Sequence, residues 1–374
     1  MKKLISIIFA LLLALALPVA VFADEKAEEK LTLPDYTKHL PYYYTLMTKA
    51  EKEDYLTIRK AVINHDKVLR VKAADMSQEF IEKAQLILYK YDSYTFDLEN
   101  VGGSSSGFKR NGVYRPTDFE LKFNYKMSKE NYMRAISYTD KKVQKFLEGI
   151  PEDMSTTNKL LAAHDFIIES CEYDLEYEHG YSAYSAIVYG RALCEGYAKA
   201  FQYICEEMGI PCVISIGESN ESKIGHAWNK VKVGKNWYNI DVTNDDTDGD
   251  FFGYISKNYF FLADSEYKTV VTETFFDELE EPLATDTEHA YYEMTNQTFK
   301  TSEEAIKYME TKLQKDLPVH VVVAFTTKAE YNKFGKAYFD AATKTPAMKK
   351  YRDVSAYKID LDESLTYMLY FFAS

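Results

Sequence analysis

Three residues of this sequence have the side-chain types of a nucleophilic catalytic site: Cys194, His226 and Asp241. A cysteine attacks a carbonyl carbon as its thiolate, and a nearby imidazole takes up the thiol proton. A carboxylate then orients the imidazole and stabilises its charged form. The chemistry that this set predicts is acyl transfer through a thioester.

Cys194 stands where a polar turn is predicted to become a helix. Apolar residues follow at helical spacing from Tyr197 to Met208, and Gly209 with Pro211 marks the helix end. Backbone N–H groups without helical partners, together with the helix dipole, stabilise an anion at the first turn. The position therefore favours a reactive thiolate, and the N–H of Cys194 is a natural oxyanion donor.

The other three cysteines are interpreted as packing residues. Cys171 ends the apolar face of a helix predicted after residue 153, Cys205 lies inside the Cys194 helix, and Cys212 opens a strand. Their clustering argues against a disulfide framework, although a bridge between two of these three stays open as an alternative. His164, on the same apolar face as Cys171, is also interpreted as a core residue.

A predicted β-hairpin brings His226 and Asp241 together. A two-residue turn at Gly234-Lys235 pairs Val233 with Asn236, and this register makes His226 and Asp241 diagonal neighbours. A turn shifted by one residue toward the N-terminus would place the two directly opposite each other. Both registers keep them on one face of the hairpin, whereas an odd slip would separate them.

The two faces of this hairpin differ in character. The face without His226 is mainly apolar, which predicts that it packs on the core. The His226 face is polar and aromatic, which is typical of a cleft wall, and Trp228 on that face is predicted to contact substrate.

These motifs resemble the transglutaminase-like core of the papain-like cysteine enzymes. The resemblance covers about residues 150–270 and rests on the blocks "GRALCEGYAKAFQYICEEMGIPC", "GHAWNKVKVGKNWYNIDVTNDD" and "YFFLADSEY". In that family the corresponding cysteine, histidine and aspartate form the triad, which implies the same roles for Cys194, His226 and Asp241. Asn244 departs from the pattern, because many relatives have tryptophan there.

The resemblance implies an α+β fold in which a helix bearing the cysteine packs on an antiparallel sheet. It implies action on peptide or protein amides, as hydrolysis, deamidation or glutamine–lysine cross-linking. The alternative is a catalytically silent transglutaminase-like module that binds or scaffolds partners in the cell envelope. A third hypothesis is that the N-terminal region covers the cleft as an inhibitory segment.

The rest of the chain predicts two smaller flanking domains. A signal peptide is expected over residues 1–23, an α+β domain over 24–148, the catalytic core over 149–284 and an α/β module over 285–374. In the first domain, the runs 93–100 and 119–125 alternate like strands. Between these runs lie the segment "GGSSSG" and the turn pair Asn111-Gly112.

The N-terminus has the pattern of a secretory signal: two lysines, an apolar run from Leu4 to Phe22, and a small residue, Ala23, at the expected cleavage site. An uncleaved membrane anchor is the alternative. Cleavage predicts a secreted or envelope-associated protein, with no stable membrane insertion afterwards and a substrate at the cell surface.

Charge narrows the range of partners. The chain has 45 Lys and Arg against 58 Asp and Glu; without the two signal lysines, 43 basic residues remain and the net charge is −15. Such an acidic balance argues against nucleic acid as a partner.

No cofactor or metal is predicted. The acidic stretch 244–250 partly matches a calcium-binding loop, but Ile255 occupies the position of the required bidentate glutamate, so a solvated loop is preferred.

Overall fold

The computed structural model describes residues 31–177, 179–220, 222–246, 255–267, 271–274, 279–287, 291–314, 319–345, 349, 354–361 and 365–373. The predicted signal peptide and residues 247–250 of the acidic stretch lie outside these residues. The chain divides into two compact units. Described residues of unit 1 lie in 31–153 and 170–207, and those of unit 2 in 154–169 and 208–373. Both units draw on the predicted middle domain, whose boundaries at 149 and 284 stay predictions.

Unit 1 is a mixed α+β unit. Its elements in chain order are α2 (Tyr42–Thr45), α3 (Lys49–Ile63), β1 (Val68–Lys72), α4 (Gln78–Lys90), the 3-10 helix η1 (Ser93–Thr95), β2 (Leu98–Arg110), β3 (Val113–Tyr125), α5 (Lys129–Leu147), β4 (Glu172–Tyr173), the π-helix η2 (Ser185–Tyr189), β5 (Arg191–Ala192) and α7 (Cys194–Glu207). Strands β1, β3 and β2 form an antiparallel sheet in that order, and β4 pairs with β5 in parallel.

Helix boundaries in unit 1 follow the capping signals of the sequence. Thr48 and Glu51 form a capping box at the start of α3, in which the side chain of each residue accepts the backbone N–H of the other. Ser77 and Ser128 cap α4 and α5 in the same position. Each cap satisfies an N–H group that the helix itself leaves without a partner.

The prediction for residues 93–107 was wrong in two places. Ser93–Thr95 is a 3-10 helix rather than the start of a strand, because the Asp92 carboxylate accepts the N–H of Tyr94. The glycine-serine segment is part of β2, where Gly102 pairs with Lys122 and Ser106 with Asp118. The turn at Asn111-Gly112 fixes this pairing, since both residues have positive φ, as a hairpin turn of this kind requires.

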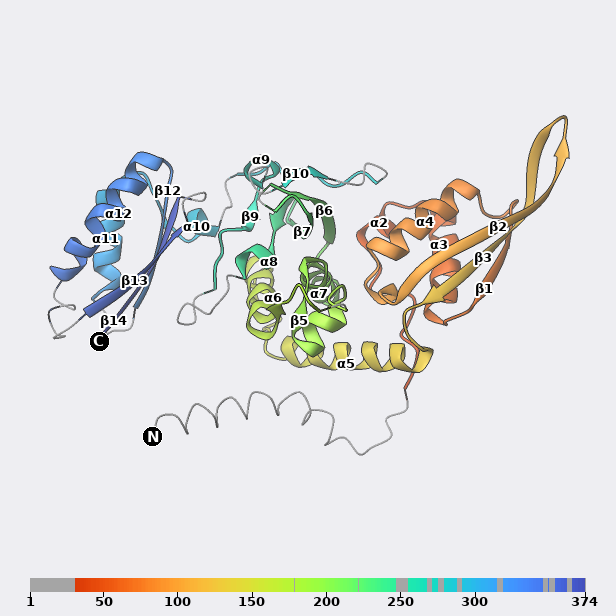
Figure 1. The fold of residues 1–374 in the computed structure, drawn as a ribbon, viewed down its shortest axis with the longest axis horizontal. Coiled ribbons are helices and arrows are strands. Elements are labelled where there is room, and N and C mark those ends of the chain that lie inside the picture. Colours follow the sequence, from red (N-terminus) through yellow and green to blue (C-terminus); the bar gives the residue numbers. More distant parts are fainter. Residues whose placement is uncertain are drawn as a thin grey trace. The chain divides into compact units, whose positions relative to one another are not determined.

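The β2–β3 hairpin is much longer than the third strand of its sheet. Helices α3 and α4 lie beside one part of the sheet. The end of the hairpin around Asn111-Gly112 projects beyond these helices (Figure 1). Residues from Gly102 to Arg110 in β2 are exposed. Among the residues that the structure describes, their strand partner is β3, so strand pairing rather than a core holds this arm.

A buried ion pair lies beneath α3. Arg59 and Asp92 are both fully buried, and the guanidinium meets the carboxylate through two contacts, Nε–Oδ2 at 2.6 Å and Nη2–Oδ1 at 3.0 Å. Arg59 Nη2 also donates to the carbonyl of His39 at 2.9 Å, and Tyr55 donates its hydroxyl to Asp92 Oδ2 at 2.7 Å. Every strong group of this cluster is therefore satisfied by another.

Helix α7 is fastened at its C-terminal end to the N-terminal part of unit 1. Gln202 donates to the carbonyl of Tyr91 at 2.7 Å, and Ser93 donates to Glu206 at 2.6 Å. Tyr203 donates its hydroxyl to Asp140, and the ring of His39 contacts both Glu206 and Glu207. The C-terminal half of the helix that begins with Cys194 is thus held by contacts with residues far earlier in the chain.

The pKa of His39 is raised to about 9: burial alone would lower it, but hydrogen bonds and attraction from Glu206 and Glu207 outweigh burial. A raised pKa means that the protonated ring stabilises the fold below the unfolded value near 6.5 and loses this contribution as the pH rises through about 9. Over that window the free energy of unfolding is expected to fall by up to about 3 kcal/mol. Chemical unfolding at successive pH values measures it.

The control for this prediction is a second histidine. His39→Asn removes the titrating ring and keeps a residue that tolerates its left-handed backbone, with φ of 49°. The variant should be less stable at pH 6 and lack the alkaline decline, whereas the same change at exposed His320 should keep it. An unchanged decline in His39→Asn would contradict the assignment.

Unit 2 contains two sheets. Its elements in chain order are α6 (Thr156–Ser170), β6 (Cys212–Ser219), β7 (Gly225–Val233), β8 (Asn236–Ile240), α8 (Val242–Asp245), β9 (Phe260–Leu262), α9 (Asp264–Tyr267), β10 (Val271–Thr274), α10 (Tyr291–Met294), β11 (Thr298–Phe299), α11 (Ser302–Lys312), β12 (Val319–Phe325), α12 (Lys328–Thr343), β13 (Val354–Leu361) and β14 (Thr366–Ala373). The first sheet is antiparallel, in the order β10-β6-β7-β8-β9.

His164 of α6 is buried, as predicted, but it is not simply an apolar-core residue. Its Nε2 contacts Asp245 at 3.1 Å and its Nδ1 contacts Asp165 at 2.9 Å. Asp245 also accepts the Ser256 hydroxyl at 2.8 Å. This polar cluster ties α6 to the short helix α8 and the segment before β9.

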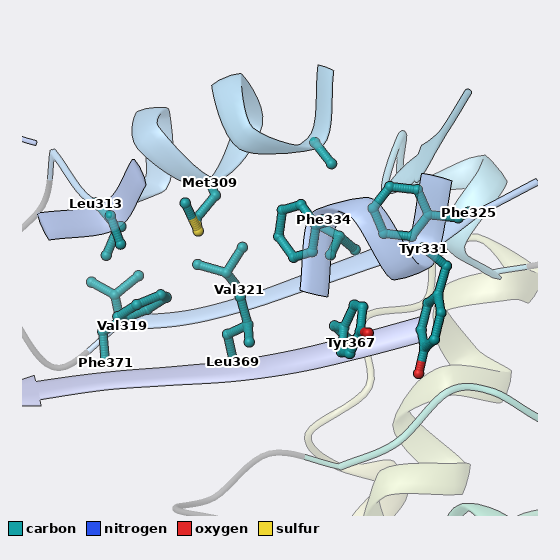
Figure 2. Packing of buried hydrophobic residues seen from close by; sticks show 13 residues of the cluster. Met309, Leu313, Val319, Val321, Phe325, Tyr331, Phe334, Tyr367, Leu369 and Phe371 are labelled. Atoms are coloured by element: carbon teal, nitrogen blue, oxygen red, sulfur yellow. The ribbon is translucent and has the colours of Figure 1, made fainter. Parts of the chain in front are cut away.

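The second sheet of unit 2 has the order β11-β12-β14-β13, and helices α11 and α12 lie on one of its faces (Figure 1). Figure 2 shows side chains of both helices packed against β12 and β14. The Tyr331 and Tyr367 rings stack at 4.1 Å, and Gly335 leaves room for the Tyr367 hydroxyl, where a Cβ would lie 2.1 Å away. This sheet and its two helices lie within residues 285–374, the range over which an α/β module is predicted.

Candidate active site

The hairpin formed by β7 and β8 has the first of the two predicted registers. Val233 pairs with Asn236, and the turn lies at Gly234-Lys235, where Gly234 has φ of 61°. The ladder ends at the pair Asn229 and Ile240. Asp241 then leaves the strand and caps α8, because its carboxylate accepts the N–H of Asn244.

His226 and Asp241 are in direct contact. His226 Nε2 lies 2.7 Å from Asp241 Oδ2; the histidine is 9% exposed and the aspartate 0%. A carboxylate in this position fixes both the ring orientation and the proton on the facing nitrogen. Nε2 is the ring nitrogen that faces Asp241, and Nδ1 is the other ring nitrogen.

Two further residues hold the Asp241 carboxylate. Tyr267 of α9 donates its hydroxyl to Oδ2 at 2.5 Å, and the Asn244 side chain donates to the same oxygen at 2.6 Å. Sequence reasoning missed both contacts. Tyr267 ends the motif block "YFFLADSEY", and Asn244 is the departure from the family pattern. That departure supplies a hydrogen bond to the predicted triad aspartate.

The pKa of the Asp241 carboxyl is lower than its ordinary value. Burial alone would raise this pKa, but the charge and hydrogen bond of His226 outweigh burial, and the bonds from Tyr267 and Asn244 act in the same direction. The carboxylate is therefore charged throughout the neutral range. It contributes stability above its unfolded pKa of about 3.9, and this contribution is lost only as the pH falls through the lower folded value.

Tyr267→Phe removes the hydroxyl that donates to Asp241 and leaves the ring in place. A hydrogen bond to a buried charge contributes about 1.5–3 kcal/mol, so the free energy of unfolding at pH 7 should fall by that amount. The loss of activity should be smaller than for changes at Asp241 itself, because His226 and Asn244 still orient the carboxylate. Urea unfolding of Tyr267→Phe beside Tyr89→Phe, an exposed tyrosine, checks it; equal stability of both would contradict the role.

Trp228 lies beside His226 but is 2% exposed. Its indole N–H donates to Asn239 at 2.9 Å, and its ring packs on Tyr267 at 4.9 Å and stacks with the His226 ring at 6.2 Å. The hairpin face that was expected to be an open cleft wall is thus covered around the tryptophan. Support of the His226 ring explains its position, and substrate contact by Trp228 stays a prediction.

Cys194 is the first residue of α7, as its sequence position predicts. It is a half-buried thiol, whereas the thiols of Cys171, Cys205 and Cys212 are buried; none of these four described cysteines forms a disulfide. The start of α7 lies against Gly180, whose carbonyl accepts the N–H of Leu193 at 2.9 Å. Gly196 permits this approach, because a Cβ there would lie 2.3 Å from the same carbonyl oxygen.

The structure thus brings together His226 and Asp241, within unit 2. Cys194 belongs to unit 1, and its meeting with His226 stays a prediction. Among the residues that the structure describes, no group of three or more His, Cys, Asp or Glu side chains is arranged to hold a metal ion. None of the described helices has both the length and the apolar character needed to cross a bilayer.

Comparison with known proteins agrees with this α+β architecture. The family model of the transglutaminase-like superfamily matches residues 144–242, which include Cys194, His226 and Asp241. This region of the chain is therefore similar to members of that superfamily. A search of curated proteins finds no match.

Three solved structures are similar to parts of the chain. They are a candidate cysteine protease from Cytophaga hutchinsonii (15% identity, 39% of this chain and 65% of that one, TM-score 0.26), a protein described as a TGase (18%, 57% and 63%, 0.30), and the periplasmic domain of TgpA from Pseudomonas aeruginosa bound to ethylmercury (14%, 39% and 65%, 0.21). The chain spans just under two thirds of the length of each.

Proposed function

We propose that this protein is a cysteine acyl-transfer enzyme that acts on peptide or protein amides. Cys194 is the nucleophile, His226 the general base and acid, and Asp241 the residue that orients His226. The observation that carries the proposal is the 2.7 Å contact between His226 and a buried, multiply hydrogen-bonded Asp241. A histidine held by such a carboxylate is prepared to accept a proton and to return it.

The proposed reaction begins with transfer of the Cys194 thiol proton to His226 Nδ1. The thiolate sulfur then bonds to the amide carbonyl carbon, and the backbone N–H of Cys194 stabilises the oxyanion. When the carbon–nitrogen bond breaks, His226 returns the proton to the leaving amine or ammonia, and a thioester remains. Water releases an acid from that thioester, whereas a second amine forms a new amide, so the acceptor decides between hydrolysis and cross-linking.

The proposal includes export of the mature chain to the cell envelope or the medium. The basic start and apolar run of residues 1–23 support it. The protein recovered from its host should then begin at Asp24. N-terminal sequencing of that protein is the measurement, and a retained Met1 would contradict cleavage.

Mass spectrometry tests the catalytic proposal. A glutamine-containing protein is incubated with the chain and a labelled primary amine, and Cys194→Ala serves as the blank. Amine incorporation, a deamidation shift of about one dalton, and backbone cleavage are three distinguishable products of one thioester mechanism. One of them should form with the unaltered chain and not with Cys194→Ala. Equal product from both chains would refute the proposal and favour the silent binding module.

A further inference from the structure

Unit 1 contains a cavity of about 440 Å³ that the proposed mechanism does not use. Its walls come from the segment between η1 and β2, from residues 126–127 just after β3, and from residue 177 and residues of 179–189 before α7. This volume falls within the usual range of small-ligand sites. It is also larger than one buried water or a packing defect would leave.

Aromatic rings form a continuous wall of this cavity. Tyr184 packs edge-on against Tyr189 at 4.9 Å, and Tyr189 packs against Tyr177 at 6.4 Å. The series continues from Tyr177 to His179 at 6.0 Å and from Tyr184 to Phe96 at 6.4 Å. Rings that fix one another in this way form a preorganised concave surface rather than a flat platform.

Two of the lining tyrosines are strongly exposed. Tyr181 is 46% and Tyr189 is 49% exposed, although each carries a large apolar ring. Exposed aromatic side chains gathered in a concave site are typical of a binding surface. A ligand that covers these rings removes apolar surface from water, which favours binding.

Several polar groups of the cavity lining contact other groups of the protein. The Ser182 and Ser185 hydroxyls lie 2.8 Å apart, and Ser185 also donates to the His179 carbonyl at 2.5 Å. The Asp97 carboxylate is paired with His65 at 2.9 Å. A sugar would need many hydrogen-bonding partners, whereas this lining offers mainly apolar surface. The cavity is therefore better suited to an aromatic side chain than to a glycan.

The cavity is also next to the start of the Cys194 helix. Gly180, between the lining residues His179 and Tyr181, accepts the N–H of Leu193 and lies against Gly196. The wall and the first turn of α7 are thus joined by direct backbone contact within one unit.

We infer that this cavity is a specificity pocket that binds an aromatic side chain of the peptide substrate near the reacting amide. The inference rests on the proposed acyl-transfer function for its catalytic meaning, but binding can be measured separately. It predicts a preference for Phe, Tyr or Trp over Ala at one position close to the reactive residue.

The binding experiment uses the full chain carrying Cys194→Ala. Two capped glycine peptides are titrated by NMR, identical except for a central Phe or Ala. The Phe peptide should bind at least about 10-fold more tightly. Tyr189→Ala and Tyr181→Ala should each reduce that preference about 5-fold, since each removes one aromatic contact from a half-exposed position that the fold tolerates losing. Tyr89→Ala, an equally exposed tyrosine outside the cavity, should leave the preference unchanged.

A kinetic experiment places the pocket in catalysis. We compare kcat/KM for two series of peptides that contain a reactive glutamine. One series carries Phe at each of the three positions on either side of the glutamine in turn, and the other carries Ala at the same position. One position should show a preference of about 10-fold or more, reduced by Tyr189→Ala. Equal binding and equal turnover of Phe and Ala peptides would overturn the pocket and leave the proposed function standing. Selective binding without turnover of any amide would support the pocket and count against the proposed function.

Discussion

Asp241→Asn is expected to lower kcat/KM by about 10⁴-fold while leaving the fold intact. The Oδ2 atom of Asp241 now receives His226 Nε2, the Tyr267 hydroxyl and the Asn244 side chain. An asparagine of the same shape can present its NH₂ group to His226, which would reverse the ring tautomer and leave a proton on Nδ1. The ring would then be unable to accept the thiol proton from Cys194.

The measurement combines activity with chemical modification of the thiol. At pH 6, Asp241→Asn should alkylate more slowly at Cys194 than the unaltered chain, because the imidazole no longer takes the thiol proton. Circular dichroism and thermal unfolding establish that the variant is folded. Asp264→Asn is a matched control, because the Asp264 carboxylate of α9 accepts hydrogen bonds from Asn239 and from the backbone N–H of Ala284. Full activity of a folded Asp241→Asn would remove the aspartate from the mechanism.

Arg59→Met is expected to lower the free energy of unfolding by about 3–5 kcal/mol. Arg59 meets Asp92 through two contacts inside a fully buried cluster, and Met has a similar length without charge or donors. The substitution leaves the Asp92 carboxylate buried without its counter-charge and takes a donor from the carbonyls of Tyr36 and His39. Stranding these groups costs much more than the lost pair itself contributes.

Urea unfolding of two variants distinguishes burial from charge pairing as such. Arg70→Met breaks a short contact as well, 2.6 Å to Glu120, but the Arg70 side chain is 75% exposed, so its loss should cost no more than about 1 kcal/mol. A double variant, Arg59→Met with Asp92→Asn, should recover part of the stability, because the uncompensated charge is gone. Equal losses for Arg59→Met and Arg70→Met would show that the buried cluster is not a major stabilising feature.

The part of the candidate site that could be predicted is the part fixed by local rules. A two-residue turn and strict alternation leave few registers for the β7–β8 hairpin, so the neighbourhood of His226 and Asp241 follows from the sequence between them. The start of α7 at Cys194 follows in the same way from helix periodicity and the glycine that ends it.

The contacts that could not be predicted join segments far apart in the chain. Tyr267 reaches Asp241 from a helix 26 residues later, and no local pattern announces that contact. The alternation of apolar and polar residues identified the two faces of the hairpin. It does not show which segments cover each face, so the burial of Trp228 was not predicted. Strand propensity likewise failed for the glycine-serine part of β2, since the pairing with β3 stabilises a segment whose own side chains do not favour a strand.

The attachment of α7 has a practical consequence for engineering. The region that matches the superfamily, residues 144–242, does not contain all the groups that hold α7. The partners of Gln202, Tyr203, Glu206 and Glu207 include residues of 39–140. A chimera that replaces only this region with that of another protein would contain a nucleophile-bearing helix without the residues that bind its C-terminal end. Deleting the N-terminal residues, as a test of whether they inhibit the enzyme, would also remove these partners of α7. Loss of activity after such a deletion would therefore indicate misfolding and not regulation.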